Sequence, residues 1–166
     1  ELDKLVAFAA VFGEERLDVT DRVIVKDLVT DAWSEIADFA RSRGIEASMT
    51  GFATELPPIY GNREWLKRVL RELLDNAIRH SRVKLAVAGA PRAHIEISAR
   101  QLGPHLVLGM RNAGIGMLPK IADRVFMPFN KATTARGAGS AGLALGLPLA
   151  HKLVELHGGR IRLETD

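Results

Sequence analysis

The hydrophobic positions of the chain recur with helical spacing in four segments and alternate with polar positions in shorter runs. The clearest helix is predicted for residues 63–80, where apolar residues form adjacent pairs every four positions and make a broad stripe. Helical spacing also predicts helices in residues 2–16, interrupted from Gly13 onward, in residues 29–40, ended by Gly44, and in residues 147–156. The first of these is expected to be the end of a longer helix.

The shorter runs predict strands. The expected strands cover residues 22–25, 45–49, 94–102, 105–112 and 160–165. Gly103-Pro104 predicts a hairpin turn between the third and fourth strands, and Gly158-Gly159 is expected to end the last helix. Because helices and strands are interleaved but include a hairpin, the predicted class is α+β, a mixed sheet covered by helices.

Composition narrows the possible chemistry. Apolar residues make up 47% of the 166 residues and charged residues 26%, the balance of a globular domain. The chain has no cysteine, which excludes disulfides, thiolate metal sites and cysteine nucleophiles. No apolar run approaches the roughly 18 residues that cross a bilayer, so we expect a soluble piece, whose parent chain can still be membrane-bound. A net charge of +3 is too small to indicate nucleic-acid binding.

The first candidate site lies on the helix predicted for residues 63–80. Glu72, Asn76 and Arg79 are spaced i, i+4 and i+7, flanked by Asp75 and His80. An acid, an amide and a base on one helix face can hold a hydrated cation beside phosphates, and an amide oxygen suits Mg²⁺, which keeps most of its waters. The alternative is an ordinary solvated helix face.

Two glycine-rich segments are further candidates. Asn112 shares strand parity with three apolar residues, so it is expected to face the packed side and need a partner there, and Gly114 and Gly116 allow close approach of a ligand. A G-x-G alone usually marks only a turn. Later glycines lead into the last helix, and residues 124–154 contain no acid, which suits a polyphosphate; a flexible linker is the alternative.

Together these segments resemble the boxes of sensor histidine kinases. Residues 72–80 (Glu-Leu-Leu-Asp-Asn-Ala-Ile-Arg-His) resemble the N box, and residues 112–116 (Asn-Ala-Gly-Ile-Gly) resemble the first glycine box. Residues 125–129 (Val-Phe-Met-Pro-Phe) resemble the F box, and residues 142–147 (Gly-Leu-Ala-Leu-Gly-Leu) resemble the second glycine box. Order and spacing match across about residues 20–166.

The resemblance implies the Bergerat ATP-binding fold, a two-layer α/β sandwich whose mixed sheet is covered by about three helices, with a glycine-rich lid over ATP. Residues 1–17 resemble the end of the second dimerisation-domain helix. Residues 18–166 resemble the catalytic ATP-binding domain, without the last strand of the family pattern.

The resemblance also implies residue roles. Asn76 would ligate Mg²⁺, and Glu72 would help to polarise the attacking group. Arg79 and Lys131 would meet phosphate oxygens, while Gly114 and Gly116 admit the adenine. The full expected ATP-binding set is Asn76, Arg79, His80, Asn112, Gly114, Gly116, Phe129, Lys131, Gly139, Gly142, Leu143 and Gly146.

The implied function is transfer of the γ-phosphoryl group of Mg-ATP to a histidine on a separate dimerisation and phosphotransfer domain of the parent kinase. The same resemblance implies a response regulator as partner and a homodimeric parent. It also implies a cytoplasmic location, with the parent anchored in the inner membrane. No nucleic-acid partner is expected. None of the 5 histidines lies in the His-Glu/Asp context of an acceptor helix, so this chain is not expected to phosphorylate itself.

Three positions depart from the family pattern. Asn112 stands where the family usually has Asp, Ala144 replaces the middle glycine of the second glycine box, and Pro148 falls early in the last helix. Asn112 and Ala144 leave open a degenerate nucleotide-binding regulatory domain. A separate alternative is an ATPase of gyrase or chaperone type, in which Glu72 would activate water. A nucleic-acid-binding module is disfavoured, because the chain has 1 Tyr and 2 Trp for base stacking.

Overall fold

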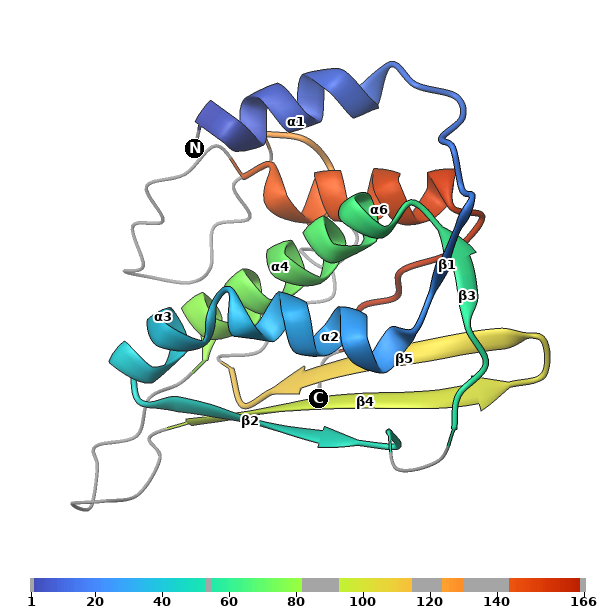
Figure 1. Ribbon diagram of the computed structural model, residues 1–166. Helices are drawn as coiled ribbons and strands as arrows, with labels where there is room; N and C mark the ends of the chain where they lie inside the picture. Colours follow the sequence, from blue (N-terminus) through green and yellow to red (C-terminus); the bar gives the residue numbers. More distant parts are fainter. Residues whose placement is uncertain (1, 53–54, 82–92, 115–123, 130–143, 165–166) are drawn as a thin grey trace. The chain divides into compact units, whose positions relative to one another are not determined.

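The computed structural model describes residues 2–52, 55–81, 93–114, 124–129 and 144–164 (Figure 1). The chain divides into two compact units. The sheet unit comprises residues 19–115, and the terminal unit comprises residues 1–18 and 116–166.

The sheet unit is built on three strands in the order β2-β4-β5. β2 (Ile45–Thr50) runs parallel to β4 (Ala93–Leu102), and β4 runs antiparallel to β5 (His105–Asn112). The hairpin between β4 and β5 is the predicted one, and Gly103 in its turn has φ 58°, a value that suits a residue without Cβ. The sheet is therefore mixed, as predicted.

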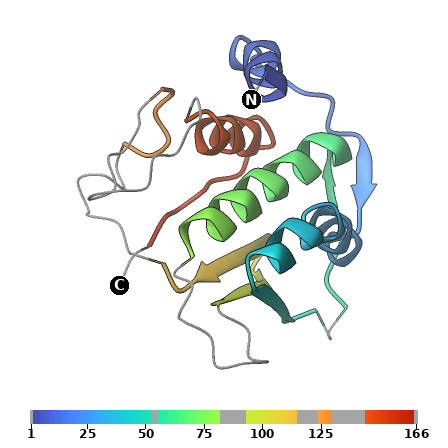
Figure 2. The ribbon, with the colours of Figure 1, turned by 90° about the vertical axis from the view of Figure 1, so that its left-hand side faces the viewer.

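Three helices cover one face of this sheet (Figure 1, Figure 2): α2 (Val25–Ser34), α3 (Ala37–Ser42) and α4 (Arg63–His80). The bounds of α4 agree with the prediction. Its N-cap Asn62 accepts a hydrogen bond from the backbone N–H of Trp65 at 3.1 Å, which satisfies one of the unpaired donors of the first turn. The layering is the two-layer α/β sandwich that was predicted.

The single helix predicted over residues 29–40 is wrong in detail. The chain forms α2 and α3 with a break at Glu35 and Ile36, and Ile36 is buried in the core. Gly44 has φ 67° just beyond α3, so the predicted glycine stop is confirmed. Two short strands, β1 (Asp21–Val23) and β3 (Ile59–Gly61), pair antiparallel. β3 was not predicted, and the predicted strand 22–25 ends where α2 begins.

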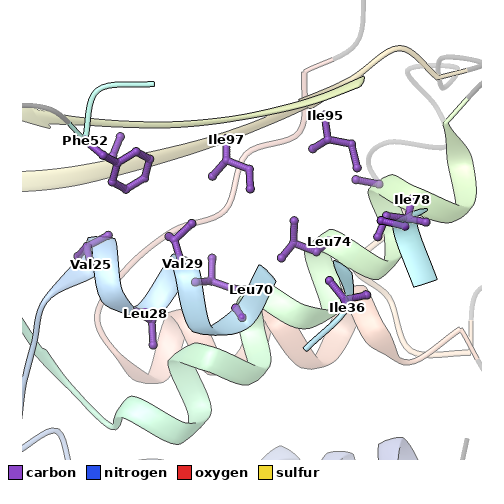
Figure 3. Packing of buried hydrophobic residues seen from close by; sticks show 14 of the residues in the cluster. Val25, Leu28, Val29, Ile36, Phe52, Leu70, Leu74, Ile78, Ile95 and Ile97 are labelled. Carbon is purple, nitrogen blue, oxygen red and sulfur yellow. The ribbon is translucent and has the colours of Figure 1, made fainter. Parts of the chain in front are cut away.

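The core of the sheet unit lies between the three strands and the three helices. Figure 3 shows Ile95 and Ile97 of β4 directed toward apolar side chains of α2 and α4. Leu74 and Ile78 of α4 are 1% and 0% exposed, so the stripe read from the sequence is the buried face of this helix. Burial of this stripe sets the rotation of α4 about its axis and thereby the direction of its other faces.

The terminal unit contains α1 (Leu2–Phe12) and α6 (Gly146–Leu156), which contact each other. Pro148 lies in the first turn of α6, where a missing N–H is tolerated. Gly158 has φ 74° and donates to the carbonyl of Glu155 at 2.9 Å, so the predicted glycine stop is again confirmed.

The strand predicted for residues 160–165 is wrong for the residues that the structure describes there, 160–164, which have no strand partner. Alternation predicts a strand only where a neighbouring edge accepts its hydrogen bonds, and the local pattern says nothing of that edge. None of the described helices combines the length and apolar character of a membrane span.

Candidate functional site

The N-box face of α4 carries a buried carboxylate. Glu72 is 5% exposed, and its Oε1 accepts a hydrogen bond from Nε of Arg68, one turn earlier, at 2.8 Å. A buried carboxylate is costly unless it is paired, and Arg68 supplies that pairing. The alternative of an ordinary solvated helix face is therefore wrong for Glu72.

Arg79 lies on the same face but is directed toward α3. Its Nε donates to both carboxylate oxygens of Asp75 at 2.9 Å, and its guanidinium carbon lies 5.3 Å from the ring centroid of Phe39. Arg43 also lies over this ring, at 5.7 Å. These contacts hold Arg79 at the surface beside α3, and its contact with phosphate oxygens stays a prediction.

Asn76 and His80 follow Glu72 at intervals of four residues along α4, and both are half-buried. Within the described part of the chain, the amide of Asn76 makes no hydrogen bond, which leaves its oxygen available as a ligand. Burial lowers the pKa of His80 from its usual 6.5, and the Arg79 cation lowers it further. His80 is therefore a neutral imidazole at neutral pH.

The end of α4 meets the end of β5 through Asn112. The side-chain Nδ2 of Asn112 donates to the carbonyl of Ala77 at 3.3 Å and to Oγ of Ser81 at 3.4 Å. Asn112 thus faces the packed side of the sheet and finds partners there, as its strand parity predicts. No residue that the structure describes donates a hydrogen bond to its Oδ1.

The first glycine box is joined to the same helix end. Gly114 forms an isolated antiparallel bridge with Ser81, the residue after the last turn of α4. The structure therefore brings together the C-terminal half of the N box, Asn112 and Gly114, three parts that are separated in sequence.

The terminal unit holds the described parts of the F box and the second glycine box. Phe129 has φ 58° and is 61% exposed, with its ring 6.0 Å from that of Phe8 in α1. Gly146 is the first residue of α6. Ala144 has φ 53°, a left-handed conformation that costs a residue with Cβ about 1 kcal/mol. The missing glycine is thus a cost in the backbone.

Five of the predicted site residues lie outside the described residues: Gly116, Lys131, Gly139, Gly142 and Leu143. Among the residues that the structure does describe, no three His, Asp or Glu side chains are grouped so that they could hold a metal ion.

Sequence reasoning missed three residues that shape this site. Ser81 contacts Asn112, Arg68 pairs with Glu72, and Phe39 lies under Arg79. Only Arg68 had a usable signal, because it lies four residues before Glu72 on a predicted helix. The other two contacts join residues that are far apart in the chain.

The chain matches the family described as "Histidine kinase-, DNA gyrase B-, and HSP90-like ATPase" over residues 61–166. Methanogenesis regulatory histidine kinase FilI of Methanothrix harundinacea is 32% identical over 140 residues, which are 84% of this chain and 14% of FilI. Sensor protein kinase PmrB of Pseudomonas aeruginosa is 30% identical over 163 residues, 98% of this chain and 31% of PmrB. The chain thus spans under a third of these relatives.

Solved structures show the same fold. Acinetobacter baumannii histidine kinase AdeS has a TM-score of 0.67 at 22% identity, covering 93% of this chain and 65% of that one. Full-length ShkA, solved in complex with AMPPNP, has a TM-score of 0.74 at 18% identity, covering 95% of this chain and 30% of that one.

Proposed function

Since the chain belongs to the histidine kinase-, DNA gyrase B- and HSP90-like ATPase family, as a catalytic ATP-binding domain of the sensor histidine kinase type, we propose that it binds Mg-ATP and transfers the γ-phosphoryl group to a histidine on a separate dimerisation domain. Such transfer depends mainly on positioning and on neutralising charge.

The observation that carries the proposal is the orientation of Asn112. Its Nδ2 donates to the Ala77 carbonyl in α4 and to Oγ of Ser81, while Oδ1 receives no hydrogen bond from any described residue. A half-buried acceptor without a donor is suited to an incoming amino group, and adenine carries one at its edge. Gly114 beside it has no side chain to obstruct a base.

Asn76 and Glu72 supply what the phosphate end requires. We propose that the amide oxygen of Asn76 ligates Mg²⁺, whose remaining positions would be filled by water and phosphate oxygens. Mg²⁺, when bound, would neutralise charge on the phosphates. Glu72, held by Arg68 at 2.8 Å, is fixed in place and can accept a hydrogen bond that orients the attacking imidazole.

The remaining parts of the proposal follow from the relatives. PmrB and FilI are named as a sensor protein kinase and a regulatory histidine kinase. By analogy with them, we propose that this domain works within a longer, homodimeric parent at the cytoplasmic face of the membrane, and that the acceptor histidine passes its phosphoryl group to a response regulator.

The test is calorimetric titration of the chain with AMPPNP, with and without Mg²⁺. We expect binding that Mg²⁺ strengthens. Asn76→Ala should remove the Mg²⁺-dependent part and leave the fold intact, because Asn76 lies away from the buried stripe of α4. Gln101→Ala is the matched control, since it removes an amide from an exposed position in the β4–β5 hairpin. Unchanged Mg²⁺-dependent affinity in a folded Asn76→Ala protein would contradict the metal-ligand role. Absence of any binding would favour the degenerate regulatory domain, to which the strained Ala144 already points.

A further inference from the structure

Ser81 and Asn112 form a small hydrogen-bonded cluster with the backbone of α4. The hydroxyl of Ser81 donates to the carbonyl of Ala77 at 2.7 Å, and Nδ2 of Asn112 donates to the same carbonyl at 3.3 Å and to Oγ of Ser81 at 3.4 Å. Ser81 is 9% exposed, so its hydroxyl depends on these partners rather than on water.

This cluster determines which end of the Asn112 amide faces α4. A backbone carbonyl can only accept, so the amide atom beside Ala77 must be the nitrogen. The proton of the Ser81 hydroxyl is directed to Ala77, and a lone pair of Oγ is left for Asn112, which again requires the nitrogen. If the amide were turned over, Oδ1 would face two acceptors, unless Ser81 gave up its own bond to Ala77.

The orientation matters because an amide, unlike a carboxylate, has two chemically different ends. A carboxylate can only accept, so an aspartate in either orientation favours an amino group over a carbonyl group at the base atom that it faces. An asparagine that could turn over would offer its oxygen to the amino group of adenine or its NH₂ to the carbonyl of guanine. At this position, therefore, selectivity between the two bases depends on whatever holds the amide in one orientation.

We propose that Ser81 is a positioning residue that holds the Asn112 amide with Oδ1 toward the bound base, and that it thereby makes the site selective for adenine over guanine nucleotides. The inference rests on the proposed function, since it assumes that a nucleotide base reaches Asn112. By this inference, Ser81 and the Ala77 carbonyl together compensate for the asparagine at position 112, where the family usually has aspartate.

The test measures dissociation constants of AMPPNP and GMPPNP, with Mg²⁺, for the wild-type chain and its Ser81→Ala and Ser81→Thr variants. The wild-type chain should prefer AMPPNP. Ser81→Ala should reduce the ratio of the two constants by roughly 3- to 10-fold, the contribution of one neutral hydrogen bond. Ser81→Thr keeps the hydroxyl and should retain the ratio. Ser42→Ala is the matched control, because Ser42 also donates to the last turn of its own helix, at 2.8 Å to Phe39, but lies at an exposed position.

Each outcome decides between the two levels of the proposal. Wild-type protein that binds neither nucleotide contradicts the proposed function and this inference with it. If the wild-type protein binds AMPPNP but folded Ser81→Ala has the same ratio of AMPPNP and GMPPNP dissociation constants, only the role of Ser81 is overturned. If Ser81→Ala does not fold, Ser81→Cys replaces it, since a thiol fills nearly the same space but is a weak hydrogen-bond donor and acceptor. The same loss of adenine selectivity is expected of Ser81→Cys. An unchanged ratio of the two dissociation constants would overturn the positioning role of Ser81.

Discussion

Replacement of Asn112 by aspartate separates its role toward the base from its role in the fold. Asn112→Asp keeps the size of the side chain and the acceptor atom, adds a negative charge, and removes the NH₂ that donates to Ala77 and Ser81. The hydroxyl of Ser81 can turn from the Ala77 carbonyl and donate to the new carboxylate, so that one carboxylate oxygen has a hydrogen-bond partner.

The two effects appear in different measurements. A charged acceptor is stronger than a neutral one, so AMPPNP should bind more tightly by about 1–2 kcal/mol, roughly 5- to 30-fold in Kd. The lost hydrogen bonds, at 3.3 and 3.4 Å, are absent from the variant both with and without nucleotide, so their loss does not change Kd. They appear instead in the free energy of unfolding, which should fall by roughly 1–2 kcal/mol, because the bonds are long and the new carboxylate is partly buried.

The assay is therefore paired: AMPPNP calorimetry for Kd, and urea unfolding followed by circular dichroism for stability. Gln101→Glu is the control, since it makes the same change of charge at an exposed position; it should leave Kd unchanged and lose only the exposed hydrogen bond from its Nε2 to Gly103. Asn112→Asp protein that binds AMPPNP no more tightly than wild type would refute the assignment of Asn112 as the base acceptor. A wild-type preference for guanine nucleotides would refute it equally.

Three further predictions follow from the same structure. The chain incubated with labelled ATP should not label itself, whereas an added dimerisation-helix pair bearing the acceptor histidine should become labelled; acid-labile label on the chain alone would disprove this. Because burial and the neighbouring Arg79 lower the pKa of His80 below 6.5, the unfolded chain binds the proton first, and stability should fall as pH drops below about 6.5. His80→Gln should make that fall shallower in urea titrations at pH 7.5 and 5.5, and an equal slope would contradict it. Leu74 is 1% exposed, so Leu74→Ala should lower the free energy of unfolding by about 2–5 kcal/mol. Leu102 is 60% exposed, so Leu102→Ala should lower it by about 0.5 kcal/mol or less. Equal losses would contradict the packing of α4.

Local patterns were enough to predict the elements that support the site. The bounds of α4 and the β4–β5 hairpin agree with the predictions because helical periodicity and the Gly103-Pro104 turn depend on residues near one another in the chain. The same holds for the family boxes, whose order and spacing are written directly in the sequence. The inward direction of Asn112 also follows locally, from strand parity.

Other features required the folded chain. The three-residue strand β3 is too short for an alternation signal, and the break between α2 and α3 serves the burial of Ile36 in a core that no local pattern describes. The strand expected at residues 160–165 had the right alternation, but the described residues there have no strand partner. In each case the deciding interaction joins distant parts of the chain.

The site divides in the same way. That Asn112 would face inward and need a partner was evident from the sequence, and so was the place of Glu72 on the N-box face of α4. Which atoms satisfy Asn112 was not, because Ala77 and Ser81 precede it by 35 and 31 residues. The burial of Glu72 likewise emerged only in the folded chain. Sequence periodicity reflects neighbours along the backbone, whereas the direction of an amide and the burial of a carboxylate depend on neighbours in space, which only the tertiary structure assembles.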